Sequence, residues 1–211
     1  MATSEALATS RALLLSAAVL AGCAGTSGAT RTAESSAVVL RAPVGAESTT
    51  LAALTSSRQA TVLVFWSSGC PCVRRYQARV EAFAERYASR DVQVLAVSSN
   101  AGEPFEEALS VARERGVRVP LLRDDGGEVA KLVGARSTPT VALLDRSGAV
   151  RFVGWLDNER EPGVEGREAW LEQAVEGVLG GGSFAKRTPT WGCPITRSLS
   201  SVEPRRCEAA H

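Results

Sequence analysis

The first half of the chain is dominated by two runs of mostly apolar residues and by one regularly spaced apolar stripe. The runs at residues 61–66 and 92–97 are rich in β-branched side chains, which predicts two buried parallel strands. Between them, apolar side chains recur three or four residues apart, which predicts an amphipathic helix from about Pro71 to Arg90. The stripe consists of Val73, Tyr76, Val80, Phe83 and Tyr87.

The second half of the chain continues the alternation of predicted strands and helices, with a predicted β-hairpin before the last helix. Glycines end all three of its predicted helices, and the turn at residues 146–148 joins two strands. The resulting βαβ…ββα order predicts an α/β fold with a central mixed sheet flanked by helices. The remaining predicted elements are helices at 103–115, 127–133 and 165–179, strands at 119–122, 140–144 and 149–153, and an extra strand at 37–40.

The N-terminal segment has the pattern of a targeting sequence. Arg11 precedes an apolar run at residues 12–21, which is too short to span a bilayer but has the length of a signal-peptide core. The run ends Leu20-Ala21-Gly22-Cys23, which resembles the lipobox of bacterial lipoproteins. That resemblance implies a signal peptide at 1–22, acylation of Cys23, and an exported protein lipid-anchored to a bacterial membrane, facing the periplasm or the cell exterior. A plain secretory signal is the alternative.

The rest of the chain divides into three parts by composition. Small and polar residues at 23–36 are typical of a flexible tether. The predicted strands and helices occupy a single domain at 37–180. Residues 181–211 are rich in Pro, Arg and Ser and contain two cysteines, which indicates a C-terminal tail and not a second core.

Composition narrows the chemistry to the cysteines. The net charge of +1 and the lack of a basic block argue against nucleic acid as a partner. The single histidine, His211, is the last residue, so Ser-His-Asp and Cys-His catalysis and the commonest zinc ligand are excluded. No bound metal or cofactor is therefore expected. The candidate reactive residues are Cys23, Cys70, Cys72, Cys193 and Cys207.

Cys70 lies where the first strand meets the helix, in the segment Phe65-Trp66-Ser67-Ser68-Gly69-Cys70-Pro71-Cys72. Its position predicts the helix N-cap, where unpaired N–H groups and the positive end of the helix dipole favour a thiolate. Pro71 suits the first helical position, because its missing N–H would have no partner there. The spacing therefore predicts an activated cysteine without a histidine.

The same junction resembles the thioredoxin superfamily, as does Ser137-Thr138-Pro139-Thr140 ahead of a strand and hairpin. The pair Cys70-Pro71 followed by Arg75-Tyr76 is most similar to the redoxin group, the alkyl hydroperoxide reductase and thiol-specific antioxidant relatives. The resemblance spans about residues 37–180 and implies a thioredoxin-like fold with a cis Thr138–Pro139 bond facing Cys70. It implies a thiol–disulfide oxidoreductase whose substrates are protein or small-molecule thiols and disulfides, with peroxide as an alternative oxidant.

The resemblance also assigns the residues around Cys70. Cys70 is the expected nucleophile, with Thr138 and Pro139 beside it. Trp66, Ser67 and Pro71 are expected to bind substrate, Trp66 as a wall of the site.

Two departures from the family patterns matter. The thioredoxin C-x-x-C is here C-x-C, and residues two apart on a helix point about 200° apart, so Cys72 is expected to face away from Cys70. Cys72 is therefore either a buried helix cysteine or a resolving residue after a distortion of the turn. The peroxiredoxin pattern keeps Ser67 but has Leu63 in place of proline and Pro139 in place of arginine, which favours an oxidoreductase over a peroxidase.

The tail cysteines leave two readings open. A fourteen-residue segment from Leu179 reaches at most roughly 45 Å, enough for Cys193 to reach and resolve Cys70. Alternatively, Cys193 and Cys207 form a structural disulfide with each other. Two further functions compete with an enzyme: a soft-metal site for Cu(I) built from Cys70, Cys72 and a tail cysteine, and a non-catalytic interaction module at a membrane surface.

Overall fold

A six-stranded mixed sheet forms the centre of the computed structural model, which describes residues 37–159, 166–182, 185–197 and 208–210. The pairs β3–β4, β4–β5 and β8–β9 are parallel, and β3–β7 and β7–β8 are antiparallel. In sheet order the strands are β5 (Leu121–Arg123), β4 (Val92–Ser98), β3 (Ala60–Trp66), β7 (Thr140–Asp145), β8 (Val150–Gly154) and β9 (Lys186–Arg187).

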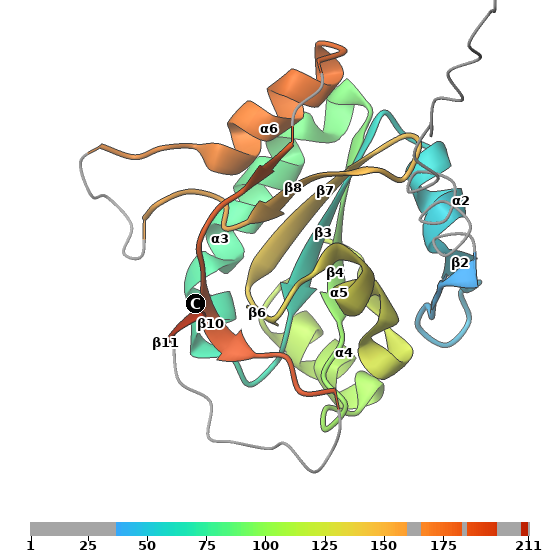
Figure 1. The fold of residues 1–211 in the computed structure, drawn as a ribbon. Helices are drawn as coiled ribbons and strands as arrows, with labels where there is room; N and C mark the ends of the chain where they lie inside the picture. Colours follow the sequence, from blue (N-terminus) through green and yellow to red (C-terminus); the bar gives the residue numbers. More distant parts are fainter. Residues whose placement is uncertain (1–36, 160–165, 183–184, 198–207, 211) are drawn as a thin grey trace, which may run out of the picture.

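Helices cover both faces of this sheet, and Figure 1 shows α3 and α6 on the opposite side from α2. Alternation along β3 explains the two layers: Val62 and Val64 pack with α3, α4 and α6, whereas Leu63 and Phe65 pack with α2 and α5. The helices are α2 (Leu51–Ser56), α3 (Pro71–Tyr87), α4 (Phe105–Glu114), α5 (Glu128–Val133) and α6 (Trp170–Leu179), with short 3₁₀ turns η1 (Ala88–Arg90) and η2 (Asp125–Gly127).

Two small sheets complete the described part of the chain. β1 (Val39–Leu40) and β2 (Thr49–Thr50) form an antiparallel pair ahead of α2. β10 (Thr190–Pro194) lies between β11 (Glu208–Ala210) and β6 (Ser137–Thr138), antiparallel to both. This second sheet brings the C-terminal segment to the end of the central sheet at which β6 precedes β7.

The predicted fold class is confirmed. The central sheet is mixed and flanked by helices, and the predicted strands and helices of the first half recur within three residues of their expected ends. The five stripe residues of α3 are all buried, as their spacing predicts. Gly134 ends α5 in the left-handed conformation that a helix-terminating glycine permits.

Two helices differ from the sequence prediction. α6 begins at Trp170 instead of residue 165, since the Glu168 N–H donates to Asn158 (2.8 Å) and the Glu168 carboxylate accepts from the Trp170 indole (2.8 Å), which holds the preceding backbone in another conformation. α2 was not predicted. Its N-cap is Thr50, whose hydroxyl accepts from the Ala53 N–H at 3.1 Å.

The prediction of a tail that begins at 181 and lies outside the domain is wrong for residues 185–197. β9 extends the central sheet, β10 pairs with β6, and Ile195 is buried in the core layer beneath α5. The attachment is largely backbone hydrogen bonding, for example Ile195 N–H to the Arg136 carbonyl and Ala101 N–H to the Thr196 carbonyl, each 2.8 Å. A polar composition does not reveal such an attachment, because backbone N–H and C=O groups form hydrogen bonds whatever side chain the residue carries.

The predicted signal peptide and tether at 1–36 and the predicted acylated Cys23 lie outside the described residues. Among the helices of the described residues, none is both long enough and apolar enough to cross a membrane.

Candidate functional site

Cys70 is held at the boundary between β3 and α3. It is the N-cap of α3 with an extended backbone (φ −91°, ψ 115°), and Pro71 follows in the first turn, as the sequence predicts. The side chain is 1% exposed, while the neighbouring Gly69 and Pro71 are exposed. Cys70 is therefore a buried thiol placed immediately behind an exposed turn.

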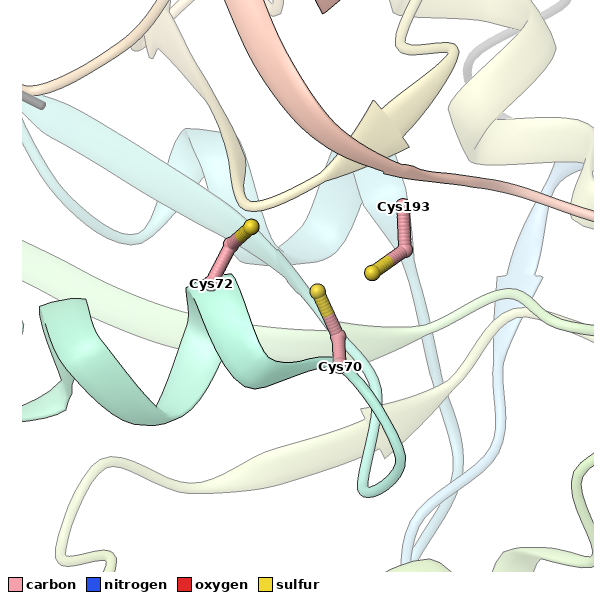
Figure 2. Close-up of side chains that lie close together, drawn as sticks. All are labelled: Cys70, Cys72 and Cys193. Atoms are coloured by element: carbon pink, nitrogen blue, oxygen red, sulfur yellow. The ribbon is translucent and has the colours of Figure 1, made fainter. Parts of the chain in front are cut away.

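Cys193 reaches Cys70 from the C-terminal segment. β10 pairs antiparallel with β6 so that Cys193 lies opposite Thr138, and the Cys193 side chain is 1% exposed. Figure 2 shows the sulfur atoms of Cys70 and Cys193 facing each other. Both are thiols and neither takes part in a disulfide, so the predicted alternative of a Cys193–Cys207 bridge is not what the structure holds.

Gly192 makes this close approach possible. Its φ is +140°, and a Cβ added to it would lie 2.0 Å from the Thr138 carbonyl oxygen and 2.7 Å from the carbonyl carbon. Any other residue would therefore push β10 away from β6, so the glycine before Cys193 is a geometric requirement of the pairing.

Cys72 contributes a third sulfur. The Sγ atoms of Cys70, Cys72 and Cys193 all lie within 4.8 Å of one another, so the prediction that Cys72 faces away from Cys70 is wrong. The helical-wheel argument failed because Cys70, as the N-cap, has extended backbone angles and does not follow the helical wheel of α3. Cys72 itself is 3% exposed and disulfide-bonded.

Hydrogen bonding at this site favours the thiolate form of Cys70. A hydrogen bond from the Cys193 thiol is the main cause that lowers the pKa of Cys70, from an ordinary value of 9.0 to about 6. Burial opposes this change, and further hydrogen bonds from the Thr138 side chain and from the backbone of Val73 and Cys193 reinforce it. As a neutral thiol, Cys70 instead donates to the Thr138 carbonyl at 3.0 Å.

The low pKa predicts a pH dependence with a defined sign. The folded pKa of Cys70 lies below the pKa of the unfolded chain, so its contribution to stability is complete at high pH and is lost as pH falls through about 6. We expect the thiolate ultraviolet absorbance of the protein to titrate with a midpoint near 6, and Cys70→Ser to remove that step. A wild-type midpoint near that of an ordinary cysteine would contradict the assignment.

The Thr138–Pro139 peptide bond is cis, as the resemblance implied, and it lies against Cys70 through the Thr138 carbonyl. The three residues expected to bind substrate differ in exposure. Pro71 is exposed, whereas Trp66 is 2% exposed with its indole N–H donating to Gln77 (3.3 Å), and Ser67 is fully buried. In this state Trp66 and Ser67 support the site from inside, and their binding roles stay predictions.

Glu103 was missed by the sequence analysis, which placed it only at a helix start. Its buried carboxylate accepts hydrogen bonds from the Ser67 hydroxyl (3.2 Å), the Ser68 N–H (2.6 Å) and the Ser68 hydroxyl, and from Ser98 (3.2 Å). Arg123 donates to the carbonyl of Glu103 at 3.1 Å. This buried carboxylate fixes the loop ahead of Cys70, because movement of the loop would take donors away from a charge that water cannot reach.

A cluster of aromatic rings holds β10 beside Cys70. Trp155 lies 4.4 Å from the Trp191 ring and 4.6 Å from that of Tyr76, centroid to centroid, and Trp170 stacks on Trp191 at 6.4 Å. The Trp155 indole N–H also donates to the Trp191 carbonyl at 2.8 Å. The rings of β10, α3 and α6 therefore fix the strand that carries Cys193.

The Redoxin family model matches residues 32–169. A curated relative, thiol-disulfide oxidoreductase ResA of Halalkalibacterium halodurans, is 30% identical over 88 residues, which is 42% of this chain and 49% of the relative. The chain thus spans about half the length of the curated relative it matches.

Solved structures show the same fold over more of the chain. A protein of Sinorhizobium meliloti 1021 described as hypothetical aligns with a TM-score of 0.66 and 28% identity, covering 78% of this chain and 93% of that one. The thioredoxin domain of a thiol-disulfide oxidoreductase from Bacteroides vulgatus aligns with a TM-score of 0.50 and 16% identity, covering 68% and 94%. The second likeness concerns the fold alone.

Proposed function

Because the chain belongs to the redoxin family and has its thioredoxin-like fold, we propose that it is a thiol–disulfide oxidoreductase in which Cys70 is the nucleophile and Cys193 the resolving cysteine. The observation that carries this proposal is the buried contact between the two thiols, with the pKa of Cys70 lowered to about 6 chiefly by Cys193. A thiolate at neutral pH is the form that attacks disulfides.

The proposed reaction has two exchange steps. The Cys70 thiolate attacks a substrate disulfide, which forms a mixed disulfide and releases one substrate thiolate. The Cys193 sulfur, after losing its proton, then attacks Cys70 Sγ, forms the Cys70–Cys193 disulfide and releases the second substrate thiolate. The resulting bridge closes a loop of more than 100 residues, which in the chain-entropy treatment stabilises the oxidised protein by about 4–5 kcal/mol.

Access to Cys70 requires movement of β10. Cys70 and Cys193 are both nearly inaccessible while β10 pairs with β6, so a protein disulfide has no direct path to the nucleophile. The exposed Gly69 and Pro71 mark the side from which a substrate approaches once the strand opens. Protein disulfides and small-molecule disulfides are both candidate substrates, and peroxide is an alternative oxidant for the same thiolate.

The test is oxidation of the dithiol by defined substrates. The reduced protein is mixed with a model protein disulfide, with glutathione disulfide or with hydrogen peroxide, and the cysteines are mapped by mass spectrometry after acid quenching. We expect disulfide substrates to give a Cys70–Cys193 bridge. Fast reaction with peroxide and none with either disulfide would identify a peroxidase instead.

A soft-metal site is a second candidate function, favoured by the three clustered sulfur atoms. Thiolates suit Cu(I), but the bonded state of Cys72 leaves only two thiols, so three-sulfur binding needs the reduced protein. One Cu(I) bound per fully reduced chain, and lost in Cys193→Ser, would support this function. Binding that does not depend on Cys193 would exclude it.

We also propose that the chain is exported and anchored to a membrane by lipid on Cys23. The support is Leu20-Ala21-Gly22-Cys23 behind the apolar run at 12–21, since an acylated N-terminal cysteine anchors a protein stably. We expect metabolic labelling with a fatty acid to mark the wild type and not Cys23→Ala. Equal labelling of both proteins would leave a plain secretory signal.

A further inference from the structure

The β4–α4 loop, residues 99–104, contacts both segments that carry the reactive thiols. At one end, the Asn100 side-chain oxygen accepts from the Thr196 N–H (2.9 Å) and from the Thr196 hydroxyl (3.3 Å), just beyond β10. At the other end, the Glu103 carboxylate accepts from the Ser68 N–H (2.6 Å), two residues ahead of the nucleophile. One loop therefore holds the nucleophile's own loop and the strand that delivers its partner.

The contact with Thr196 is buried and involves backbone groups on both sides. Asn100 is 2% exposed, and the adjacent Ala101 N–H donates to the Thr196 carbonyl at 2.8 Å. The N–H and the C=O of Thr196 are thus both paired with the same loop, three residues beyond Cys193. While β10 is closed, the Thr196 N–H has the Asn100 oxygen as its acceptor.

Arg123 fixes the shape of this loop from inside the fold. Its guanidinium is 9% exposed, and Nη1 donates to the Ser98 hydroxyl (3.1 Å) and to the carbonyls of Asn100 (3.0 Å) and Glu103 (3.1 Å). A buried guanidinium that loses such bonds is left with unpaired charge-bearing donors, which is costly. The separation between the Asn100 end and the Glu103 end is therefore set by one side chain.

We infer that Asn100 is a positioning residue for the resolving step, a latch that holds the segment after β10 and so keeps Cys193 against Cys70. It acts through the strand and not on a reacting sulfur. The inference rests on the proposed function for the roles of the two cysteines. Opening of β10 to admit a substrate breaks the latch, and closure of β10 re-forms it.

Loss of the latch acts on the closed state alone. In Asn100→Ala the closed strand keeps the Thr196 N–H without its acceptor, whereas in the open state water pairs that N–H in both proteins. The open population should therefore rise by about tenfold. In a mixed disulfide with substrate, β10 must close again before Cys193 can attack, so bridging should slow by a similar factor.

A single reagent measures both effects in the reduced full-length protein. Dithiobis(nitrobenzoate), an aromatic disulfide, forms a mixed disulfide with Cys70 and releases one thionitrobenzoate; attack of Cys193 on Cys70 then releases the second. In Asn100→Ala we expect the first release to be about tenfold faster and the second about tenfold slower than in the wild type. Mass mapping of quenched samples assigns each phase. Unchanged phases, or two phases changed in the same direction, would overturn the latch.

Two further variants separate the latch from general damage. Asn100→Asp keeps an acceptor oxygen and should return both phases toward the wild-type rates; an Asp variant that behaves like the Ala variant would overturn the latch. Ser99→Ala is the matched control, because Ser99 is 3% exposed on the same loop but donates to Asp124 (2.7 Å) and not to the β10 segment. Its two phases should match those of the wild type, and a change like that of Asn100→Ala would also overturn the latch.

Native-state hydrogen exchange tests the latch without any variant. The amides of Ala101 and Thr196 bond across the contact, and the amide of Ile195 bonds to the chain ahead of β6. If they open together with β10, the three amides should exchange with one opening free energy, while the Ser68 amide held by Glu103 stays more protected. An Ala101 amide much more protected than that of Ile195 would show that β10 opens without breaking the latch.

These outcomes are separable from those of the proposed function. Hydrogen exchange needs no turnover, so three amides that open together in a protein inert toward disulfides would support the latch and refute the oxidoreductase proposal. Normal oxidation by disulfides with unchanged phases in Asn100→Ala would do the reverse.

Discussion

Cys70→Ser is expected to abolish oxidation of the protein by external disulfides, with a loss of at least about a thousand-fold in rate, because the nucleophile of the first exchange is removed. Cys193→Ser should behave differently. Its Cys70 still attacks, so the variant should accumulate a stable mixed disulfide with the substrate. The measurement is intact-mass spectrometry of the quenched protein, which separates a mixed disulfide from an internal one.

The two variants serve as controls for each other. Serine replaces a buried thiol in both, at sites that are each 1% exposed, so general damage to packing should be similar. Cys193→Ser keeps a side-chain donor beside Cys70, whereas Cys193→Ala removes the hydrogen bond that is the main cause of the low pKa of Cys70, so the first step of Cys193→Ala should slow at acidic and neutral pH and recover as pH rises. Normal turnover by Cys193→Ser would instead assign the resolving step to Cys72 or to an external thiol.

The local part of the site could be predicted because it depends on neighbouring residues. Cys70 as a helix N-cap, Pro71 at the first helical position and the cis bond before Pro139 follow from short motifs within single elements. The core was predictable for the same reason, since a stripe such as that of α3 needs only the period of the helix. Short-range patterns identified the proposed nucleophile, Cys70, and the layer behind it.

The long-range part of the site could not be predicted from such patterns. The sequence analysis showed that Cys193 can reach Cys70 but left its partner open, since chain length bounds a distance and does not choose a contact. The choice is made by pairing of β10 with β6 and by the rings of Trp155 and Trp170 around Trp191. Glu103 is similar, because its partners Ser67 and Ser68 lie 35 or more residues away.

Gly192 carried a usable signal, because a glycine directly before a functional cysteine is typical of a close backbone approach. We expect Gly192→Ala to release β10 from β6, since the new Cβ would overlap the Thr138 carbonyl. Overpacking of this kind costs about 1–3 kcal/mol, so the open population should rise by about 5- to 150-fold. Alkylation of Cys70 in the reduced protein should accelerate by that factor.

Gly181→Ala is the matched control for this variant. Gly181 also has a positive φ, +74°, but a Cβ there would meet nothing within 4 Å, so alanine adds backbone strain without a clash. Its Cys70 alkylation rate should stay near the wild-type value. Gly192→Ala should also slow closure of the Cys70–Cys193 bridge, because the strand that delivers Cys193 no longer rests opposite Thr138. Faster alkylation together with slower bridging would show that β10 both covers Cys70 and delivers Cys193, whereas faster alkylation alone would show that β10 only covers Cys70. Unchanged rates of both reactions would show that the β6–β10 pairing does not control Cys70.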